Sequence, residues 1–199
     1  MKRIIILSPA YIATGGTELL QQLCAELNMD NIYSEMYYTS VYKDSPVEEK
    51  FSEYNNPITT ELVDDDDSII VIPETLIDYA YSIKRAKIYI WWLSVDNYYG
   101  ANRIKYDFIR NFVYRIKDKM NSKLFKKCDH LVQSEYARQY LLKEKNVQPS
   151  KIDSLSDYLN KEFLNENRSN GDRESIILYN PKKGIDFTMR IMEEVGEYE

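Results

Sequence analysis

Short runs of β-branched and aromatic residues alternate along the chain with segments whose apolar residues recur every three or four positions. The runs predict strands over residues 3–7, 32–41, 69–72, 87–95, 129–133 and 152–155. The amphipathic segments predict helices over residues 17–27, 74–82 and 135–145, with Thr17 and Ser134 as N-caps of the first and third. Alternating strands and helices with short links are typical of a parallel sheet with right-handed crossovers. We therefore expect an α/β domain over residues 1–164, with a Rossmann-like, doubly wound and mostly parallel sheet.

The C-terminal part of the chain has a different pattern. Residues 165–173, NENRSNGDR, are polar and predict a linker. Beyond the linker, residues 175–179 predict one strand and residues 185–195 predict one helix. A single strand–helix unit cannot bury its apolar faces alone. We therefore expect residues 174–199 to be the first unit of an incomplete second domain.

Composition excludes several classes of protein. The 199 residues carry 26 Lys and Arg against 32 Asp and Glu, a formal net charge of −6, which argues against a nucleic-acid partner because phosphates are bound mainly by excess cationic side chains. Cys24 and Cys128 predict buried, reduced thiols, and the single histidine, His130, predicts a core residue within a strand, so we expect no metal and no other cofactor. The apolar start is short and is broken by Ser8 and Pro9, which favours a strand over a signal peptide. We expect a cytoplasmic protein.

Candidate binding residues follow the first predicted strand. The sequence TGGTE, residues 14–18, joins this strand to the first helix, and ligands of open α/β sheets sit at the carboxyl ends of the strands. Gly15, Gly16 and Thr17 would let backbone N–H groups approach a phosphate at the helix N-terminus. A tight turn is the alternative that paired glycines also suit. Neither GxGxxG nor Gly-Lys-Ser/Thr is present here, which argues against a dinucleotide fingerprint and a Walker loop.

Candidate catalytic chemistry follows the strand at residues 87–95. The two tryptophans of WWLSVDNYYG, residues 91–100, would point to opposite faces and pack in the core. Asp96 would lie at the ligand edge, where a carboxylate can act as a general base or bind sugar hydroxyls, and Asn97 and Tyr98 would bind substrate beside it. An Asp-Asn turn is the alternative. Glu74 follows the neighbouring strand and would bind substrate in the same crevice, unless it serves only as a first-turn carboxylate of its helix.

Two segments are strongly charged. The acidic run at residues 64–67 has no second ligand cluster and predicts a solvated loop. Residues 102–127 predict a long helix with nine Lys or Arg against two Asp, a balance of +7 that leaves −13 for the rest of the chain. Its apolar residues recur at every fourth position: Ile104, Phe108, Phe112, Ile116 and Met120. Such a helix can bind an anionic membrane surface, and the alternative is a helix packed on the sheet with a charged outer face.

Several motifs, in this order, resemble the N-terminal half of a GT-B glycosyltransferase. They are ILSPAYIATGGTELLQQL, IVIPETL, IYIWWLSVDN, DHLVQSEYARQYL and ILYNPKKGIDFT. The chain is similar to enzymes of capsular polysaccharide and exopolysaccharide biosynthesis, over nearly its whole length but over only about half of such an enzyme. The resemblance implies two Rossmann-like domains with the active site in the cleft between them. It also implies that Gly15 and Gly16 face the donor diphosphate and the acceptor, and that Asp96 lines the acceptor side.

The leading interpretation is a glycosyltransferase, as a fragment or a truncated form, that transfers a sugar from a nucleotide-sugar donor to a lipid-linked or polysaccharide acceptor in cell-surface glycan biosynthesis. The alternative is a non-catalytic GT-B-like half that binds acceptor, membrane or a separate partner half. A third class, a nucleotide-dependent oxidoreductase, is disfavoured because GxGxxG is absent. The resemblance implies that the second domain binds most of the nucleotide. We therefore expect the chain alone to bind the donor weakly or not at all and to transfer no sugar at an appreciable rate. If the protein is peripheral at the inner face of the plasma membrane, we expect residues 102–127 to make that contact.

Overall fold

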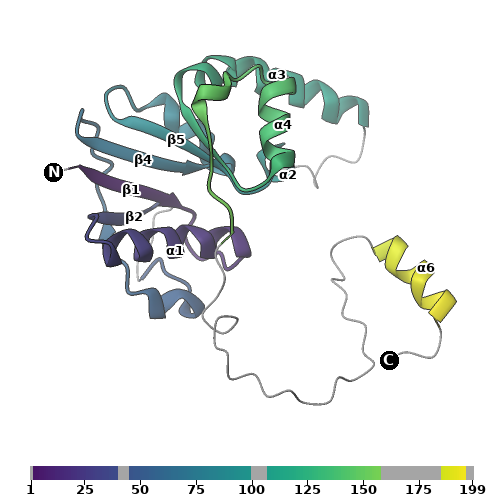
Figure 1. Cartoon of the computed structure of the whole chain (residues 1–199), viewed down its shortest axis with the longest axis horizontal. Coiled ribbons are helices and arrows are strands. Elements are labelled where there is room, and N and C mark those ends of the chain that lie inside the picture. The colour runs from purple at the N-terminus through teal and green to yellow at the C-terminus, as the bar shows by residue number, and fades with distance from the viewer. Residues whose placement is uncertain (1, 40–44, 100–106, 158–184, 196–199) are drawn as a thin grey trace, which may run out of the picture. The chain divides into compact units, whose positions relative to one another are not determined.

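The computed structural model describes residues 2–39, 45–99, 107–157 and 185–195 (Figure 1). The chain divides into two units, Met1–Tyr158 and Leu159–Glu199. In the second unit the structure describes one helix, α6 (Ile185–Val195), which has the bounds predicted for it. The linker predicted at residues 165–173 and the strand predicted at residues 175–179 lie outside the described residues, so the assignment of a second domain stays a prediction.

The first unit contains a seven-stranded sheet in which every pair of neighbouring strands is parallel. Its strands are β1 (Arg3–Ser8), β2 (Ser34–Tyr38), β3 (Ile58–Thr59), β4 (Ser68–Pro73), β5 (Lys87–Trp92), β6 (Asp129–Val132) and β7 (Ile152–Ser154). They follow the order β3-β2-β1-β4-β5-β6-β7. The chain therefore reverses its direction across the sheet between β1 and β4, which is the switch point of a doubly wound fold. The predicted Rossmann-like α/β class is confirmed.

Helices cover both faces of this sheet (Figure 1). On one face α1 (Gly15–Met29) packs over β1 and β2, where Leu20 and Cys24 share a core with Trp91. The other face carries η2 (Glu74–Tyr81), α2 (Val95–Tyr99), α3 (Asp107–Lys127) and α4 (Glu135–Glu144). Trp92 and Phe125 belong to the core on that second face. The two tryptophans thus pack on opposite faces, as predicted. The short 3-10 helices η1 (Glu49–Tyr54) and η4 (Pro149–Lys151) complete the described elements of this unit.

Helix starts agree with the sequence at α4 and differ at α1. Ser134 caps α4 as predicted, since its hydroxyl accepts a hydrogen bond from the N–H of Ala137 at 3.3 Å. The N-cap of α1 is Thr14, and the prediction of Thr17 is wrong. The reason is a reciprocal pair of bonds, in which the N–H of Thr17 donates to Thr14 Oγ1 at 3.3 Å and the N–H of Thr14 donates to Thr17 Oγ1 at 2.9 Å.

The single histidine is a core residue. His130 is fully buried, and its Nδ1 accepts a hydrogen bond from Trp92 Nε1 at 3.0 Å while its Nε2 lies 3.0 Å from the carbonyl oxygen of Phe125. Burial lowers the pKa of His130 to about 4, so the ring is neutral at neutral pH and Nε2 donates. Cys24 and Cys128 are buried and free, and burial raises the pKa of each thiol to about 11. These placements agree with the prediction for all three residues.

The acidic loop before β4 is accessible, but one of its carboxylates has a structural role. Asp64 accepts hydrogen bonds from the N–H groups of Lys84, Arg85 and Ala86 at 2.9, 2.8 and 2.8 Å. These bonds hold the pKa of Asp64 below its ordinary value. Asp66 forms an ion pair with Arg85 at 2.6 Å. The loop therefore fixes the turn that enters β5, and over the described ranges no group of three or more Asp, Glu, His or Cys side chains is arranged to hold a metal ion.

Candidate functional site

The candidate site lies at the carboxyl edge of the sheet, around the switch point. Because all strands are parallel, the segments that follow β1, β4 and β5 meet at this edge (Figure 1). The first segment leads to Gly15, the second begins with Glu74, and the third leads to Asp96. A Cβ atom added at Gly16 would lie 3.5 Å from Leu93 Cδ1, so the start of α1 is in contact with the chain that leaves β5. The structure therefore brings these three segments together.

Gly15 and Gly16 are the first residues of α1, not the corner of a tight turn. No atom lies within 4 Å of a Cβ added at Gly15, and the Cβ of Gly16 would meet its neighbours only at ordinary contact distance. The first N–H groups of a helix have no intrahelical acceptor and carry a partial positive charge. The two glycines place no side chain beside these N–H groups, and the surroundings of Gly15 are open, which suits an anionic group such as a phosphate.

Thr17 is engaged within the loop. Its side chain is buried, and its hydroxyl donates to the carbonyl oxygen of Ile12 at 2.8 Å while it accepts from the N–H of Thr14. These bonds hold the segment between β1 and α1 in one conformation. Thr17 thus shapes the loop whose N–H groups would meet a ligand. Its hydroxyl is used in hydrogen bonds to Ile12 and Thr14 of that loop.

Glu74 is the most unusual ionisable group at this edge. It is only 1% exposed, and its Oε2 accepts a hydrogen bond from the N–H of Leu93 at 2.9 Å. Burial raises its pKa from 4.5 to about 7, against the opposing effect of the N–H groups of Leu93, Glu74 and Ser94 and of the Lys117 ammonium. Glu74 is thus both a first-turn carboxylate of η2 and a link from the end of β4 to the end of β5. It can take up or release a proton near neutral pH.

Lys117 of α3 supplies a cation next to this edge. Its Nζ donates to the carbonyl oxygen of Tyr98 and lies 4.4 Å from the centroid of the Tyr98 ring. Burial lowers the pKa of Lys117, while the charges of Asp78, Asp118 and Glu74 oppose that effect. Charge and composition do not separate Lys117 from the other lysines of its segment. Its helical position could have identified it, because Lys117 follows Tyr114 by three residues and precedes Asn121 by four, on the side of α3 that faces the core.

The candidate residues Asp96, Asn97 and Tyr98 lie in α2, a short helix that begins where residues 87–95 were predicted to end a strand, and they divide into two groups. Asp96 and Asn97 are exposed at the edge, where a ligand can reach them. Tyr98 is fully buried, its hydroxyl accepts from Asn121 Nδ2 at 2.9 Å, and its ring centroid lies 5.2 Å from that of Trp92. This enclosure leaves the Tyr98 ring no surface for a substrate, because a five-residue helix must bury one side to stay on the sheet. Tyr98 anchors α2, and Asp96 and Asn97 take the outward side.

A half-buried polar network holds α2 to its neighbours. The hydroxyl of Tyr99 lies 2.6 Å from that of Tyr140 and 2.7 Å from Lys145 Nζ, which donates to it. Lys145 also pairs with Asp118 at 2.6 Å. These four side chains come from α2, α4, the end of α4 and α3, so the network joins all three helices. The segment that carries Asp96 is thereby supported on its inner side.

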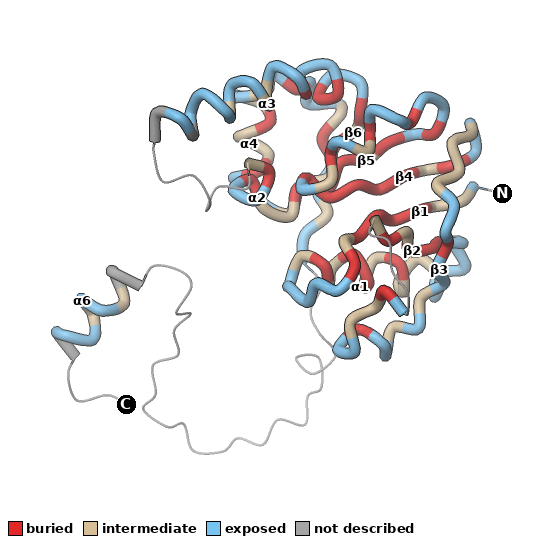
Figure 2. Tube along the Cα trace, turned by 180° about the vertical axis from the view of Figure 1, so that it is seen from behind, coloured by how far each residue is buried: buried red, intermediate tan, exposed pale blue. Residues whose placement is uncertain are grey.

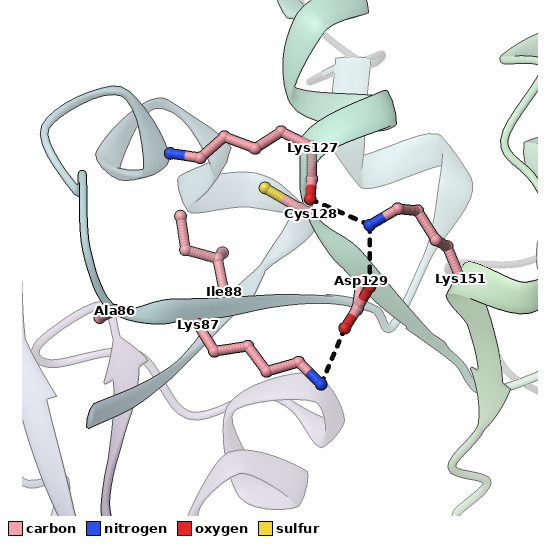
Figure 3. A pocket seen from close by; sticks show the side chains of 7 residues that line it. All are labelled: Ala86, Lys87, Ile88, Lys127, Cys128, Asp129 and Lys151. Atoms are coloured by element: carbon pink, nitrogen blue, oxygen red, sulfur yellow. Dashed lines mark hydrogen bonds and ion pairs between the residues drawn. The ribbon is translucent and has the colours of Figure 1, made fainter. Parts of the chain in front are cut away.

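A depression of about 270 Å³ lies at the opposite edge of the sheet, at the amino ends of β5 and β6 (Figure 3). Lys87 and Lys151 both pair with Asp129 there, at 2.9 and 3.1 Å. Lys127 Nζ donates to the carbonyl oxygen of Ile83 at 3.0 Å. The lysines around this depression are thus bound to groups of the protein, and the depression is separate from the switch-point edge.

Comparisons with protein-family models, with curated proteins and with solved structures found no match to this chain. The structure itself shows a seven-stranded, all-parallel α/β sheet of the Rossmann-like kind. None of the helices in the described ranges combines the length and the apolar character needed to cross a bilayer.

Proposed function

We propose that this chain is the acceptor-side domain of a GT-B glycosyltransferase, which transfers a sugar from a nucleotide-sugar donor to a lipid-linked or polysaccharide acceptor in cell-surface glycan biosynthesis. The observation that supports this most is the switch-point edge. There the open N-terminus of α1 at Gly15 and Gly16, the buried carboxyl of Glu74 and the exposed Asp96 and Asn97 meet on one parallel sheet. The chemistry of these groups matches a phosphate-containing donor and a hydroxyl acceptor.

Each group has a role in the proposed transfer. Asp96 accepts the proton of the acceptor hydroxyl as a general base, and Asn97 binds a neighbouring sugar hydroxyl. The N–H groups at the start of α1 face the diphosphate of the donor. Glu74 is a positioning residue, because it accepts the N–H of Leu93 and so fixes the segment that leads to Asp96. Holding donor and acceptor in this geometry supplies much of the rate enhancement in such a reaction.

Other Rossmann-type activities are supported less well. The residues after β1 contain neither GxGxxG nor Gly-Lys-Ser/Thr, which dinucleotide enzymes and P-loop proteins use at this position. A non-catalytic module that binds the acceptor would need the same edge without the proton transfer. Asp96 separates the two proposals, since only the enzyme requires its carboxylate in the chemical step.

The test combines the purified chain with a nucleotide-binding GT-B second half, because the chain alone is expected to transfer no sugar at an appreciable rate. The mixture is incubated with a panel of radiolabelled nucleotide sugars and polyprenyl-diphosphate-linked sugar acceptors in detergent micelles. Transfer is measured by chromatography of the lipid product, and acceptor binding by calorimetry. The variant is Asp96→Asn, and the matched control is Asp153→Asn, which changes another exposed aspartate outside the site.

Transfer that falls at least about a hundredfold in Asp96→Asn, and not in Asp153→Asn, supports the enzyme. Acceptor binding without transfer, unchanged by either substitution, supports the non-catalytic module. If no acceptor binds and no sugar is transferred under any condition, both proposals fail.

A further inference from the structure

Helix α3 carries an apolar stripe that the protein core does not cover. Figure 2 shows α3 extending from the sheet with most of its length exposed. Only its C-terminal part enters the core, through Leu124 and Phe125. The exposed members of the stripe are Ile109 (49%), Phe112 (59%), Val113 (40%), Ile116 (44%) and Met120 (62%). The row Phe112, Ile116 and Met120, which the sequence placed on one side of the helix, therefore faces outward and not toward the sheet.

The stripe is continuous and narrow. At about 100° per residue the five side chains fall within an arc of about 100° around the helix axis. The residues that contact the first unit, including Lys117, Asn121, Leu124 and Phe125, lie on a different arc. The two arcs adjoin, about 20° apart between Val113 and Leu124, but they do not overlap, so the stripe lies beside the packing surface and is not covered by it.

A basic stripe runs directly beside the apolar one. Arg115, Lys119, Lys123 and Lys126 are exposed and fall within an arc of about 80° that overlaps the edge of the apolar arc at Lys123. Among the described residues none of the four has an ion-pair partner. The sequence of α3 carries +5 while the rest of the chain carries −11. Positive charge is therefore concentrated on this helix in an otherwise acidic protein.

We propose that this face of α3 docks on an anionic phospholipid bilayer, with the helix lying in the plane of the interface. An apolar stripe with cationic side chains along its flank is the pattern of an interfacial helix, in which the apolar residues enter the acyl boundary and the lysines reach lipid phosphates. The rest of the chain has a net negative charge, which favours contact with such a surface through α3. This inference does not rest on the proposed function.

A second copy of the chain fits this face less well. An antiparallel pair of α3 stripes would bring the basic stripes of both copies to the same side of the pair, where like charges repel. A membrane rich in anionic lipid offers the opposite charge and an apolar layer at the same place. Self-association through α3 is accordingly an outcome of the test that would overturn the proposal.

The experiment is co-sedimentation of the full chain with vesicles of phosphatidylcholine alone and of equal parts phosphatidylcholine and phosphatidylglycerol, over a range of salt concentrations. The apolar variant is Phe112→Ser with Met120→Ser, and the basic variant is Lys119→Gln with Lys123→Gln. The matched controls change equally exposed side chains on other elements, Met29→Ser with Tyr136→Ser and Lys84→Gln with Lys143→Gln. All substituted side chains are exposed, so circular dichroism should show every variant folded.

We expect binding to the anionic vesicles that weakens as salt rises, and little binding to the neutral vesicles. The basic variant should lose at least about tenfold in partitioning, since each cation near such a surface contributes about fivefold. The apolar variant should lose a similar factor, and both controls should bind like the wild type. Equal binding to both vesicles, loss in the controls, retention in the apolar variant, absence of binding, or size-exclusion evidence of an α3-dependent dimer would each overturn the proposal.

Discussion

Replacing Glu74 with Gln should remove a pH dependence from the stability of the fold. Glu74 is 1% exposed, and its pKa rises from 4.5 to about 7 because burial disfavours the charged form. A folded-state pKa above the unfolded value means that ionisation weakens the fold. The stability associated with protonated Glu74 is thus complete below pH 4.5 and is lost as the pH rises through about 7.

The magnitude follows from these two values. Each pH unit between them corresponds to about 1.4 kcal/mol, so the full interval is about 3 kcal/mol. Most of this loss in unfolding free energy, about 2 to 3 kcal/mol, occurs between about pH 5 and about pH 8. Gln resembles the protonated acid in size and keeps a carbonyl oxygen for the N–H of Leu93. Relative to Glu74→Gln, the wild type should therefore lose about 2 to 3 kcal/mol of unfolding free energy across this range.

The assay is urea unfolding of both chains at each pH, followed by tryptophan fluorescence, because Trp91 and Trp92 are buried on opposite faces of the sheet. The difference in unfolding free energy between the two chains is the measured quantity, since the contribution of His130, which changes between about pH 4 and pH 6.5, is common to both. Asp78→Asn is the matched control, because Asp78 is an exposed carboxylate on the same 3-10 helix. If the difference in unfolding free energy between the wild type and Glu74→Gln stayed constant with pH, the argument that ionisation of the buried Glu74 destabilises the fold would be refuted.

Two further predictions concern buried hydrogen bonds. His130→Ala should lower the free energy of unfolding by about 3 kcal/mol, because it opens a cavity and leaves Trp92 Nε1 without its acceptor; urea unfolding measures it. The lowered pKa of His130 also means that its contribution is present above pH 6.5 and is lost as the pH falls toward about 4, a loss that His130→Ala should not show. Thr14→Ala should cost about 1 kcal/mol by removing the N-cap of α1, whereas Thr14→Ser should retain it; thermal unfolding checks the pair, and equal losses would contradict the capping argument.

The local patterns in the sequence were sufficient for most elements. The strand at residues 69–72 and the helix behind Ser134 were predicted near their observed bounds, because an apolar run and a capping hydroxyl act within a few residues of the chain. The opposite directions of Trp91 and Trp92 followed from the alternation of side chains along a strand. The position of Gly15, Glu74 and Asp96 at one edge followed from parallel strands, once the alternation of strands and helices was recognised.

The tertiary structure decided what depends on partners far away in the chain. The two-residue strand β3 exists because it pairs with β2, and its own residues carry no strand pattern. Whether Glu74 or Asp96 is buried, and whether Tyr98 or Asn97 faces outward, depends on how α2 and α3 settle on the sheet. The spacing of the apolar row of α3 left open whether the row packs on the sheet or faces outward, and in the fold Asn121, Leu124 and Phe125 form the packing face instead. Periodicity shows that a helix has two sides, but only the surface available to it in the fold determines which side is covered.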